Sequence, residues 1–187
     1  MKILGIDPGT LVTGYGVIEC GDKGGSFKLV EYGTIESKKI ATLAVRLRVI
    51  FERLTAVIER ANPDAVAIES AFYHKNVQST LKLGHARGVA MLASILKDHT
   101  AAEYSPREIK RAVVGNGNAS KDQVEFMVRS LLGLKPADKK LPDAYDALAV
   151  AITHAARFGN DRSSSGTRKS VKNWKQFAEA NPGRIKK

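Results

Sequence analysis

The strongest constraint on the fold is a carboxylate at the end of the first strand. Ile3 to Ile6 form a short apolar run, which is typical of a buried strand, and Asp7 follows it directly. Pro8 and Gly9 suit the central positions of a type II turn, in which Gly supplies a positive φ. A carboxylate at the mouth of a buried strand needs a cation or hydrogen-bond donors. Backbone N–H groups of its own turn could satisfy Asp7, so the rest of the chain must decide.

The next segments predict two further strands. Residues 11–20 and 27–35 are rich in apolar and β-branched residues, and a turn at 22–25 separates them. Three successive strands joined by short loops indicate an antiparallel meander. Gly14 and Gly16 weaken the second strand, and they could let another backbone or a ligand come close.

A helix and a fourth strand follow the meander. An apolar stripe at helical spacing predicts a long helix that Ser37 caps and that ends before Pro63. Residues 65–68 then form another short apolar run, and Glu69 ends it. Because a helix precedes it, this strand is expected to run parallel to the first through a crossover. Asp7 and Glu69 would then lie together on one face of the sheet.

The second half of the chain predicts one strand and four helices. Ser105 and Ser120 each open a capping box, which marks a helix start. The predicted elements are a helix from about 77 to 97, a strand at 99–104, helices beginning at Ser105 and Ser120, and a last helix from Pro142 to about Phe158. Gly84 and Gly88 make a flat strip on the first of these helices, against which another helix of this chain or of a second copy could pack.

The last helix adds two more acids. Asp143 and Asp146 are three residues apart in its first turn, so they share a face near the positive end of the helix dipole. Asp143 could merely cap the helix while Asp146 faces water. Taken with Asp7 and Glu69, however, they predict a cluster of four carboxylates.

This cluster favours a hard cation. No His or Cys cluster accompanies the acids, so Mg²⁺, with Mn²⁺ as a substitute, is preferred to zinc. Two such ions about 3.5–4 Å apart would activate a water and stabilise the leaving oxygen in phosphodiester hydrolysis.

Composition agrees with a polyanionic partner. The chain of 187 residues carries a net charge of +11, of which residues 157–187 supply +7, from nine basic and two acidic residues. We expect one folded domain over 1–158 and a basic, flexible tail over 159–187, whose charge could also serve only solubility. No apolar run approaches the roughly 18 residues of a membrane span, and no secretory signal pattern is present. With the single cysteine, Cys20, these features predict a cytoplasmic protein.

Five separated blocks resemble one known family. In order, GIDPGTLVTGYGVIE, AIESAF, KNVQSTLKLGHARG, VVGNGNASKDQV and DAYDALAVAITH are similar to the RuvC family of Holliday junction resolvases, over roughly residues 1–157. The resemblance implies an RNase H-like α/β fold: a five-stranded mixed sheet, an antiparallel meander plus two parallel strands, with helices on both faces. It also implies that Asp7, Glu69, Asp143 and Asp146 are the catalytic, metal-binding acids.

The resemblance further implies partners and DNA contacts. The family works as a homodimer that nicks two strands of a four-way DNA junction symmetrically, in homologous recombination and repair, beside a branch-migration complex of the RuvA–RuvB type. Phe72 would stack on an unpaired base, with Tyr73 as its neighbour, although Phe72 could instead anchor its loop on the core. The other positions implied or considered for DNA are Lys75, Lys82, Arg87, Lys110 and Lys121, and those for the dimer interface are Gly84 and Gly88. Lys75, Lys82 and Arg87 could also be ordinary solvated charges.

Three other functions remain open on these residues. The first motif also resembles the phosphate loop of actin-like ATPases and sugar kinases, which need a second such loop and a second domain. Putative RNA resolvases of RNase H-like fold share the same motif, but the block containing Lys82 and Arg87 argues against them. A junction-binding protein without cleavage would not need four acids.

Overall fold

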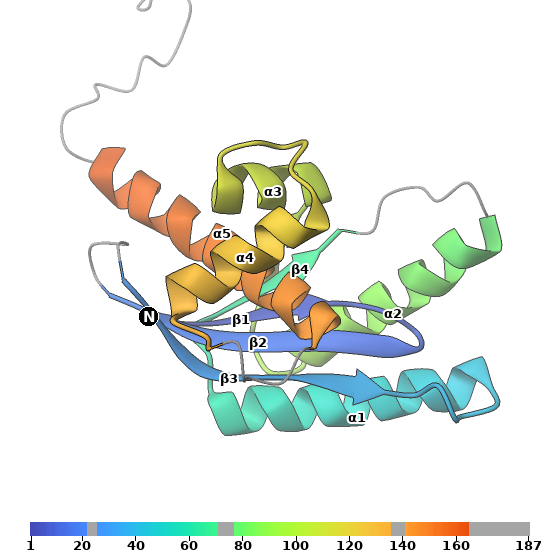
Figure 1. Cartoon of the computed structure of the whole chain (residues 1–187). Coiled ribbons are helices and arrows are strands. Elements are labelled where there is room, and N and C mark those ends of the chain that lie inside the picture. Colours follow the sequence, from blue (N-terminus) through green and yellow to red (C-terminus); the bar gives the residue numbers. More distant parts are fainter. Residues whose placement is uncertain (22–25, 71–76, 136–140, 165–187) are drawn as a thin grey trace, which may run out of the picture.

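The computed structural model describes residues 1–21, 26–70, 77–135 and 141–164. These residues form one five-stranded sheet with five helices around it (Figure 1). In chain order the elements are β1 (Lys2–Asp7), β2 (Val12–Cys20), β3 (Phe27–Glu36), α1 (Leu43–Ala61), β4 (Ala65–Glu69), α2 (Val77–Ile95), β5 (Ala101–Tyr104), α3 (Pro106–Val114), α4 (Lys121–Leu132) and α5 (Pro142–Ser164).

The sheet is mixed, as predicted. Its strand order is β3-β2-β1-β4-β5. The meander β1-β2-β3 is antiparallel, whereas β1 and β4 pair in parallel, as do β4 and β5. The helix α1 is the crossover that returns the chain to β4 beside β1.

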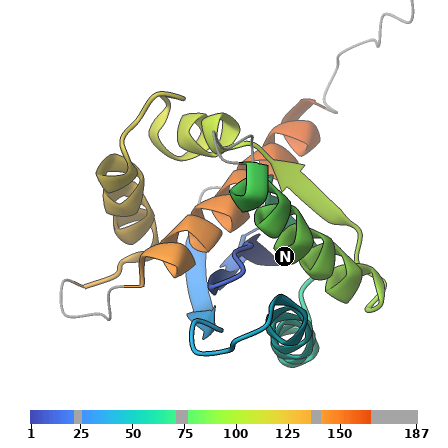
Figure 2. The ribbon, with the colours of Figure 1, turned by 90° about the vertical axis from the view of Figure 1, so that its right-hand side faces the viewer.

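Helices cover both faces of the sheet (Figure 2). Alternate residues of β1 point to opposite faces. Ile3 therefore joins a core formed with α3, α4 and α5, while Leu4 and Ile6 join a core formed with α1 and α2. Asp7 is four residues after Ile3 on the same strand, so its side chain lies on the same face of the sheet, which α5 covers.

Local capping chemistry sets the starts of α3 and α4. Ser105 and Ser120 each accept a hydrogen bond from the third helical residue, which reaches back in turn, so both predicted capping boxes are confirmed. The prediction that Ser37 caps α1 is wrong, because Thr42 does so. The Ser37 hydroxyl instead donates to the carbonyl of Thr10, at 2.7 Å, and holds the loop that follows β1.

The last helix is longer than predicted. It runs to Ser164, past the expected end at Phe158 and into the segment predicted as a flexible linker. Continuing a long helix costs far less than starting one, which outweighs the poor helix propensity of Gly159 and Asn160. The remaining tail lies outside the described residues. None of the helices in the described ranges is long and apolar enough to cross a membrane.

Candidate active site

The first two acids lie side by side at the ends of parallel strands. In the register of β1 and β4, Gly5 lies opposite Ala67 and Ile6 opposite Ile68. Asp7 and Glu69 are the next residues on each strand, and they share the face covered by α5. The juxtaposition predicted from strand order and the period of two is therefore confirmed.

The start of α5 is held against this pair by direct contact between backbones. A Cβ at Gly14 would lie 1.9 Å from the carbonyl oxygen of Asp143, and one at Gly5 would lie 2.0 Å from that of Ala147. Gly14 is paired with Asp7 in the antiparallel ladder. Because only glycine permits so close an approach, Gly14 brings the first turn of α5 over the end of β1.

Asp143 in this first turn and Asp146, one turn further along α5, complete the cluster. All four acids are half-buried. Burial raises the pKa of Asp7 well above its ordinary value, and the charges of Glu69, Asp146 and Asp143 raise it further. Burial, with the charge of Asp146, raises the pKa of Glu69 to about 7. These mutual effects show that acids from three elements share one electrostatic site.

The turn after Asp7 differs from the prediction. Gly9 does not have a positive φ, so the predicted type II turn is wrong. Glycine is required there for another reason, because a Cβ at Gly9 would lie 2.2 Å from the carbonyl oxygen of Val12. The Thr13 hydroxyl donates to the Gly9 carbonyl at 2.8 Å and closes the loop.

The carboxylate of Asp7 is not satisfied by its own turn. Within the described ranges no hydrogen bond or ion pair reaches it, nor the carboxylates of Glu69 and Asp143. The alternative in which backbone N–H groups hold Asp7 is therefore wrong. A half-buried cluster of acids with so few partners is suited to binding cations.

The donor set fits a hard divalent ion, but the side chains are not gathered around one point. In the part of the chain that the structure describes, no group of three or more Asp, Glu, His or Cys side chains is arranged to hold a metal ion. One reason is visible at Asp146, whose Oδ2 is bound by the Lys121 ammonium at 2.6 Å. Carboxylate oxygens are the ligands that Mg²⁺ and Mn²⁺ prefer, so the chemistry of the acids fits such an ion.

A cavity adjoins the acids between α3, α4 and α5. Its volume is about 210 Å³, and Glu69, Asp146, Lys110 and Lys121 form its polar side. The apolar side consists of Pro106, Ile109, Val124 and Ala149. From the sequence, both lysines were expected near DNA, but the cavity was not predicted. The only local signal for it was the pair of capping boxes, which mark where α3 and α4 begin.

Tyr104 and His154 join β5 to α5. A buried hydrogen bond of 2.8 Å links the Tyr104 hydroxyl to Nδ1 of His154. Nε2 of His154 is buried and has no hydrogen-bond partner in the described part of the chain. Arg157 lies 5.0 Å from the centre of the Tyr104 ring and pairs with Glu108 on α3. Burial, together with the charge of Arg157, lowers the pKa of His154.

The other residues considered for DNA lie elsewhere. Phe72, Tyr73 and Lys75 fall between β4 and α2, outside the described residues. Lys82 is exposed on α2. The guanidinium of Arg87 makes two hydrogen bonds with the Glu103 carboxylate, at 2.8 and 2.5 Å, so in this structure it is engaged within the chain.

The helix α2 presents an apolar face to solvent, and its N-terminal turns extend past the strands (Figure 1). The buried residues of α2 are Ala86, Ala90, Ala93 and Ser94, whereas five of its larger apolar side chains are exposed: Val77, Leu81, Met91, Leu92 and Ile95. Gly84 and Gly88 lie on this face, and a Cβ at either would meet no atom within 4 Å. A groove of about 480 Å³ runs over the two glycines between Leu47, Leu81 and Leu92. No described helix of this chain fills the glycine strip.

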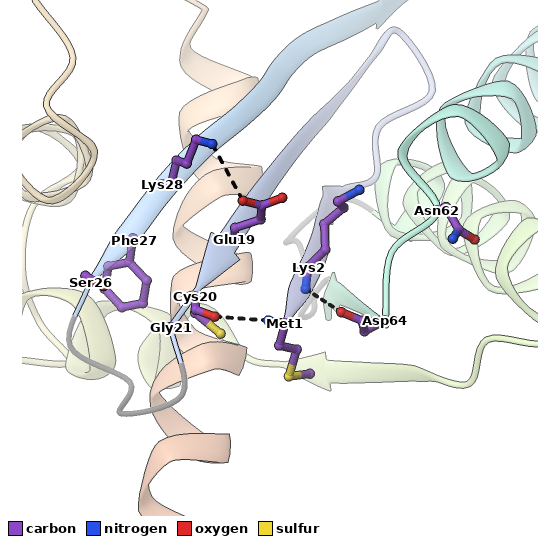
Figure 3. A pocket seen from close by; sticks show the side chains of 10 residues that line it. All are labelled: Met1, Lys2, Glu19, Cys20, Gly21, Ser26, Phe27, Lys28, Asn62 and Asp64. Carbon is purple, nitrogen blue, oxygen red and sulfur yellow. Dashed lines mark hydrogen bonds and ion pairs between the residues drawn. The ribbon is translucent and has the colours of Figure 1, made fainter.

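A third hollow, of about 530 Å³, lies at the end of the strands opposite to the acids (Figure 3). Its polar groups are already paired: the terminal ammonium donates to the Cys20 carbonyl at 3.0 Å, and the Lys2 amide donates to Asp64 at 2.6 Å. Lys28 and Glu19 lie 3.9 Å apart. The hollow therefore lacks the unpaired carboxylates that distinguish the acid cluster.

The chain matches a known family over most of its length. Residues 3–154 match the family model described as crossover junction endodeoxyribonuclease RuvC. A relative with that name from Porphyromonas gingivalis is 43% identical over 186 residues, which cover 98% of this chain and 96% of the relative. Another, from Syntrophotalea carbinolica, is 51% identical over 158 residues, covering 84% and 96%.

A solved structure agrees with the sequence comparisons. The structure described as T. thermophilus RuvC in complex with Holliday junction substrate aligns with a TM-score of 0.79 and 32% identity, covering 86% of this chain and 96% of that one. The comparisons favour the predicted resolvase over the ATPase and RNA resolvase alternatives.

Proposed function

This chain belongs to the RuvC family of crossover junction endodeoxyribonucleases, and from this membership we propose that it resolves four-way DNA junctions by symmetric, metal-dependent nicks during recombination and repair. The observation that carries the proposal is the location of Asp7, Glu69 and the two acids of α5 at one end of the sheet, close enough for their charges to act on one another. The pKa values of Asp7 and Glu69 are raised because both carboxylates are buried next to other acids. A carboxylate with a purely structural role is normally paired, so these shifts favour a functional role for the cluster.

We assign the four acids as ligands of two Mg²⁺ ions, which Mn²⁺ could replace. Bound divalent ions would supply an activated water and charge stabilisation at the leaving oxygen. The strands fix Asp7 and Glu69, and the glycine contacts fix Asp143 and Asp146 relative to them. The protein thereby sets the positions of the ligands, on which an in-line displacement depends.

Basic and aromatic residues around the cluster are assigned to DNA. Lys110 and Lys121 line the cavity next to Glu69, where their ammonium groups would meet a phosphate of the strand to be cut. Family resemblance assigns Phe72 to stacking on an unpaired base at the branch point, with Tyr73 and Lys75 on the same segment. Lys82 and Arg87 are assigned to the flanking DNA on the same ground.

We assign the exposed apolar face of α2 to a homodimer. Two nicks placed symmetrically require two identical sites, and a two-fold dimer presents them to a junction of matching symmetry. The glycine strip at Gly84 and Gly88 would let the helix of a partner copy approach closely.

Gly84→Leu should therefore lower the dimer fraction measured by sedimentation, whereas Arg53→Leu, at an exposed position of α1, should not. An unchanged dimer fraction in Gly84→Leu would move the interface elsewhere. A branch-migration complex of the RuvA–RuvB type is the further partner that the resemblance suggests.

Replacement of Glu69 tests the proposed chemistry. Glu69→Gln keeps the size of the side chain and removes a charged metal ligand, so nicking of a synthetic four-way junction in Mg²⁺ should fall by about a hundredfold or more. Junction binding should persist. Glu52→Gln makes the same change on an exposed site on α1 and should cut normally. Full cleavage by Glu69→Gln, or undiminished cleavage by the native protein in EDTA, would refute the proposal.

A further inference from the structure

One lysine and one acid of the site are bound to each other. Nζ of Lys121 lies 2.6 Å from Oδ2 of Asp146. Lys121 is the first residue of α4, where the capping box of Ser120 and Gln123 fixes the backbone, and Asp146 is in the second turn of α5. The side chain of Asp146 is 25% exposed and that of Lys121 is 60% exposed, so the pair is open to exchange with solvent and ions.

Lys121 faces the whole acid cluster. Its pKa is raised although burial opposes the change, because its ammonium hydrogen-bonds to Asp146 and faces the charges of Asp146, Asp143 and Asp7. The Lys121 charge in turn lowers the pKa values of Asp7, Glu69 and Asp146. Lys110, on the rim of the same cavity, acts in this way only on Glu69. Lys121 is thus the main counter-charge of the cluster in the described part of the chain.

We infer that Lys121 is an exchangeable counter-ion, which holds Asp146 in the metal-free protein and gives it up when a divalent cation binds. This inference rests on the proposed function, because it takes Asp146 to be a metal ligand. The lysine stays protonated throughout, so the exchange is a movement of an ammonium group away from an oxygen that the metal also needs. A doubly charged ion attracts the carboxylates more strongly than a single ammonium at a similar distance.

The exchange gives Lys121 two successive partners. In the metal-free state it offsets the repulsion among the acids, which otherwise opposes folding. Once released, its ammonium is still on the rim of the cavity beside Glu69, where it becomes available to a phosphate. The same side chain therefore stabilises the resting site and then serves the substrate.

Metal binding by the full-length protein without DNA tests the exchange. Isothermal titration with Mn²⁺ should show about fivefold tighter binding in Lys121→Met than in the native protein, the equivalent of breaking one partly exposed ion pair. Lys110→Met is the matched control, since it removes the same charge from the same cavity without a contact to Asp146. Its affinity should change less. In an Asp146→Asn background, Lys121→Met should change the affinity less than it does in the native protein, because the contact with Asp146 is already lost and only the action of the lysine charge on Asp7 and Glu69 remains.

Other results would overturn the inference. An unchanged affinity in Lys121→Met, or an equal gain in both lysine variants, would show that the pair does not compete with the metal. If Asp146→Asn alone bound Mn²⁺ as tightly as the native protein, Asp146 would not be a ligand, and the proposed metal site would fail together with the exchange. Urea unfolding in EDTA gives a second measurement: Lys121→Met should unfold at lower urea than Lys110→Met, and equal midpoints would remove the counter-ion role.

Discussion

Replacing Gly14 with Ala is expected to displace the start of α5 and the two acids it carries. A Cβ at this position would lie 1.9 Å from the carbonyl oxygen of Asp143, whereas ordinary contacts begin at 3.4 Å. Because both partners are backbone in a close-packed interior, neither can rotate away, and the helix or the strand must move by about 1.5 Å.

The expected effects on stability and on activity differ in size. Overpacking of a core commonly costs about 1–3 kcal/mol, and a clash between backbones belongs near the upper end of that range. A displacement of about 1 Å in a catalytic constellation can cost about a hundredfold in rate. We therefore expect Gly14→Ala to lose about 3 kcal/mol of stability, and its folded fraction to cut junctions about a hundred times more slowly.

Gly16→Ala is the control for this prediction. Its Cβ would lie 2.5 Å from Cδ2 and 2.6 Å from Cγ of the buried Leu148 side chain, whereas the nearest backbone atom, the Leu148 nitrogen, would be 3.2 Å away, so the main clash is with a side chain and not with a backbone. Urea unfolding gives the stability of each variant, and single-turnover cleavage of a synthetic junction with enzyme in excess gives the rate per folded protein. Gly16→Ala should lose stability but keep most of its rate. Cleavage by folded Gly14→Ala within about threefold of the native rate would refute the claim that this contact sets the site.

Three further predictions concern charge. The pKa of His154 is lowered in the folded state, so the unfolded chain binds more protons, and stability should fall as pH drops below the ordinary value of 6.5. Urea unfolding at a series of pH values should show a shallower fall of stability in His154→Gln than in the native protein. An equal fall in both proteins would show that His154 does not cause it. The pKa of Glu69 is raised to about 7 from 4.5, so its contribution to stability is present below 4.5 and lost as pH rises through about 7. Glu69→Gln should therefore stabilise the metal-free protein at pH 8 by up to about 3 kcal/mol and hardly at all near pH 4.5, and a loss of stability at pH 8 in EDTA would contradict the strain attributed to this acid. Deleting residues 165–187 leaves α5 whole and removes seven basic and one acidic residue, so junction affinity should depend less steeply on salt; an unchanged slope would show that the tail charge is incidental.

The proximity of Asp7 to Glu69 could be predicted from the sequence, because it follows from general rules of strand geometry and chain connection. Each acid ends an apolar run, a helix between the runs favours a parallel crossover, and the period of two puts both side chains on one face. The capping boxes at Ser105 and Ser120 were equally predictable, since their hydrogen bonds join residues three apart.

The errors share a different cause. At Gly9 the sequence is compatible with either a positive φ or a close approach of another backbone, and only the position of Val12 shows that the second applies. Ser37 and Thr42 both have hydroxyls suited to an N-cap, and the choice depends on a long-range partner, the Thr10 carbonyl. The bond between Lys121 and Asp146 joins helices whose packing no local pattern specifies.

The central position of β1 has a consequence for how the chain acquires activity. Its pairing with β2 closes a short hairpin, but its pairing with β4 joins Ile3 to Ala65, across the whole meander and α1. Contacts so distant in sequence form slowly, because the entropy of closing the intervening loop must be overcome before they are made. Asp7 and Glu69 meet only through this pairing. A nascent or partly folded chain therefore holds no complete set of acids, and the capacity to cut DNA arises only with the long-range topology.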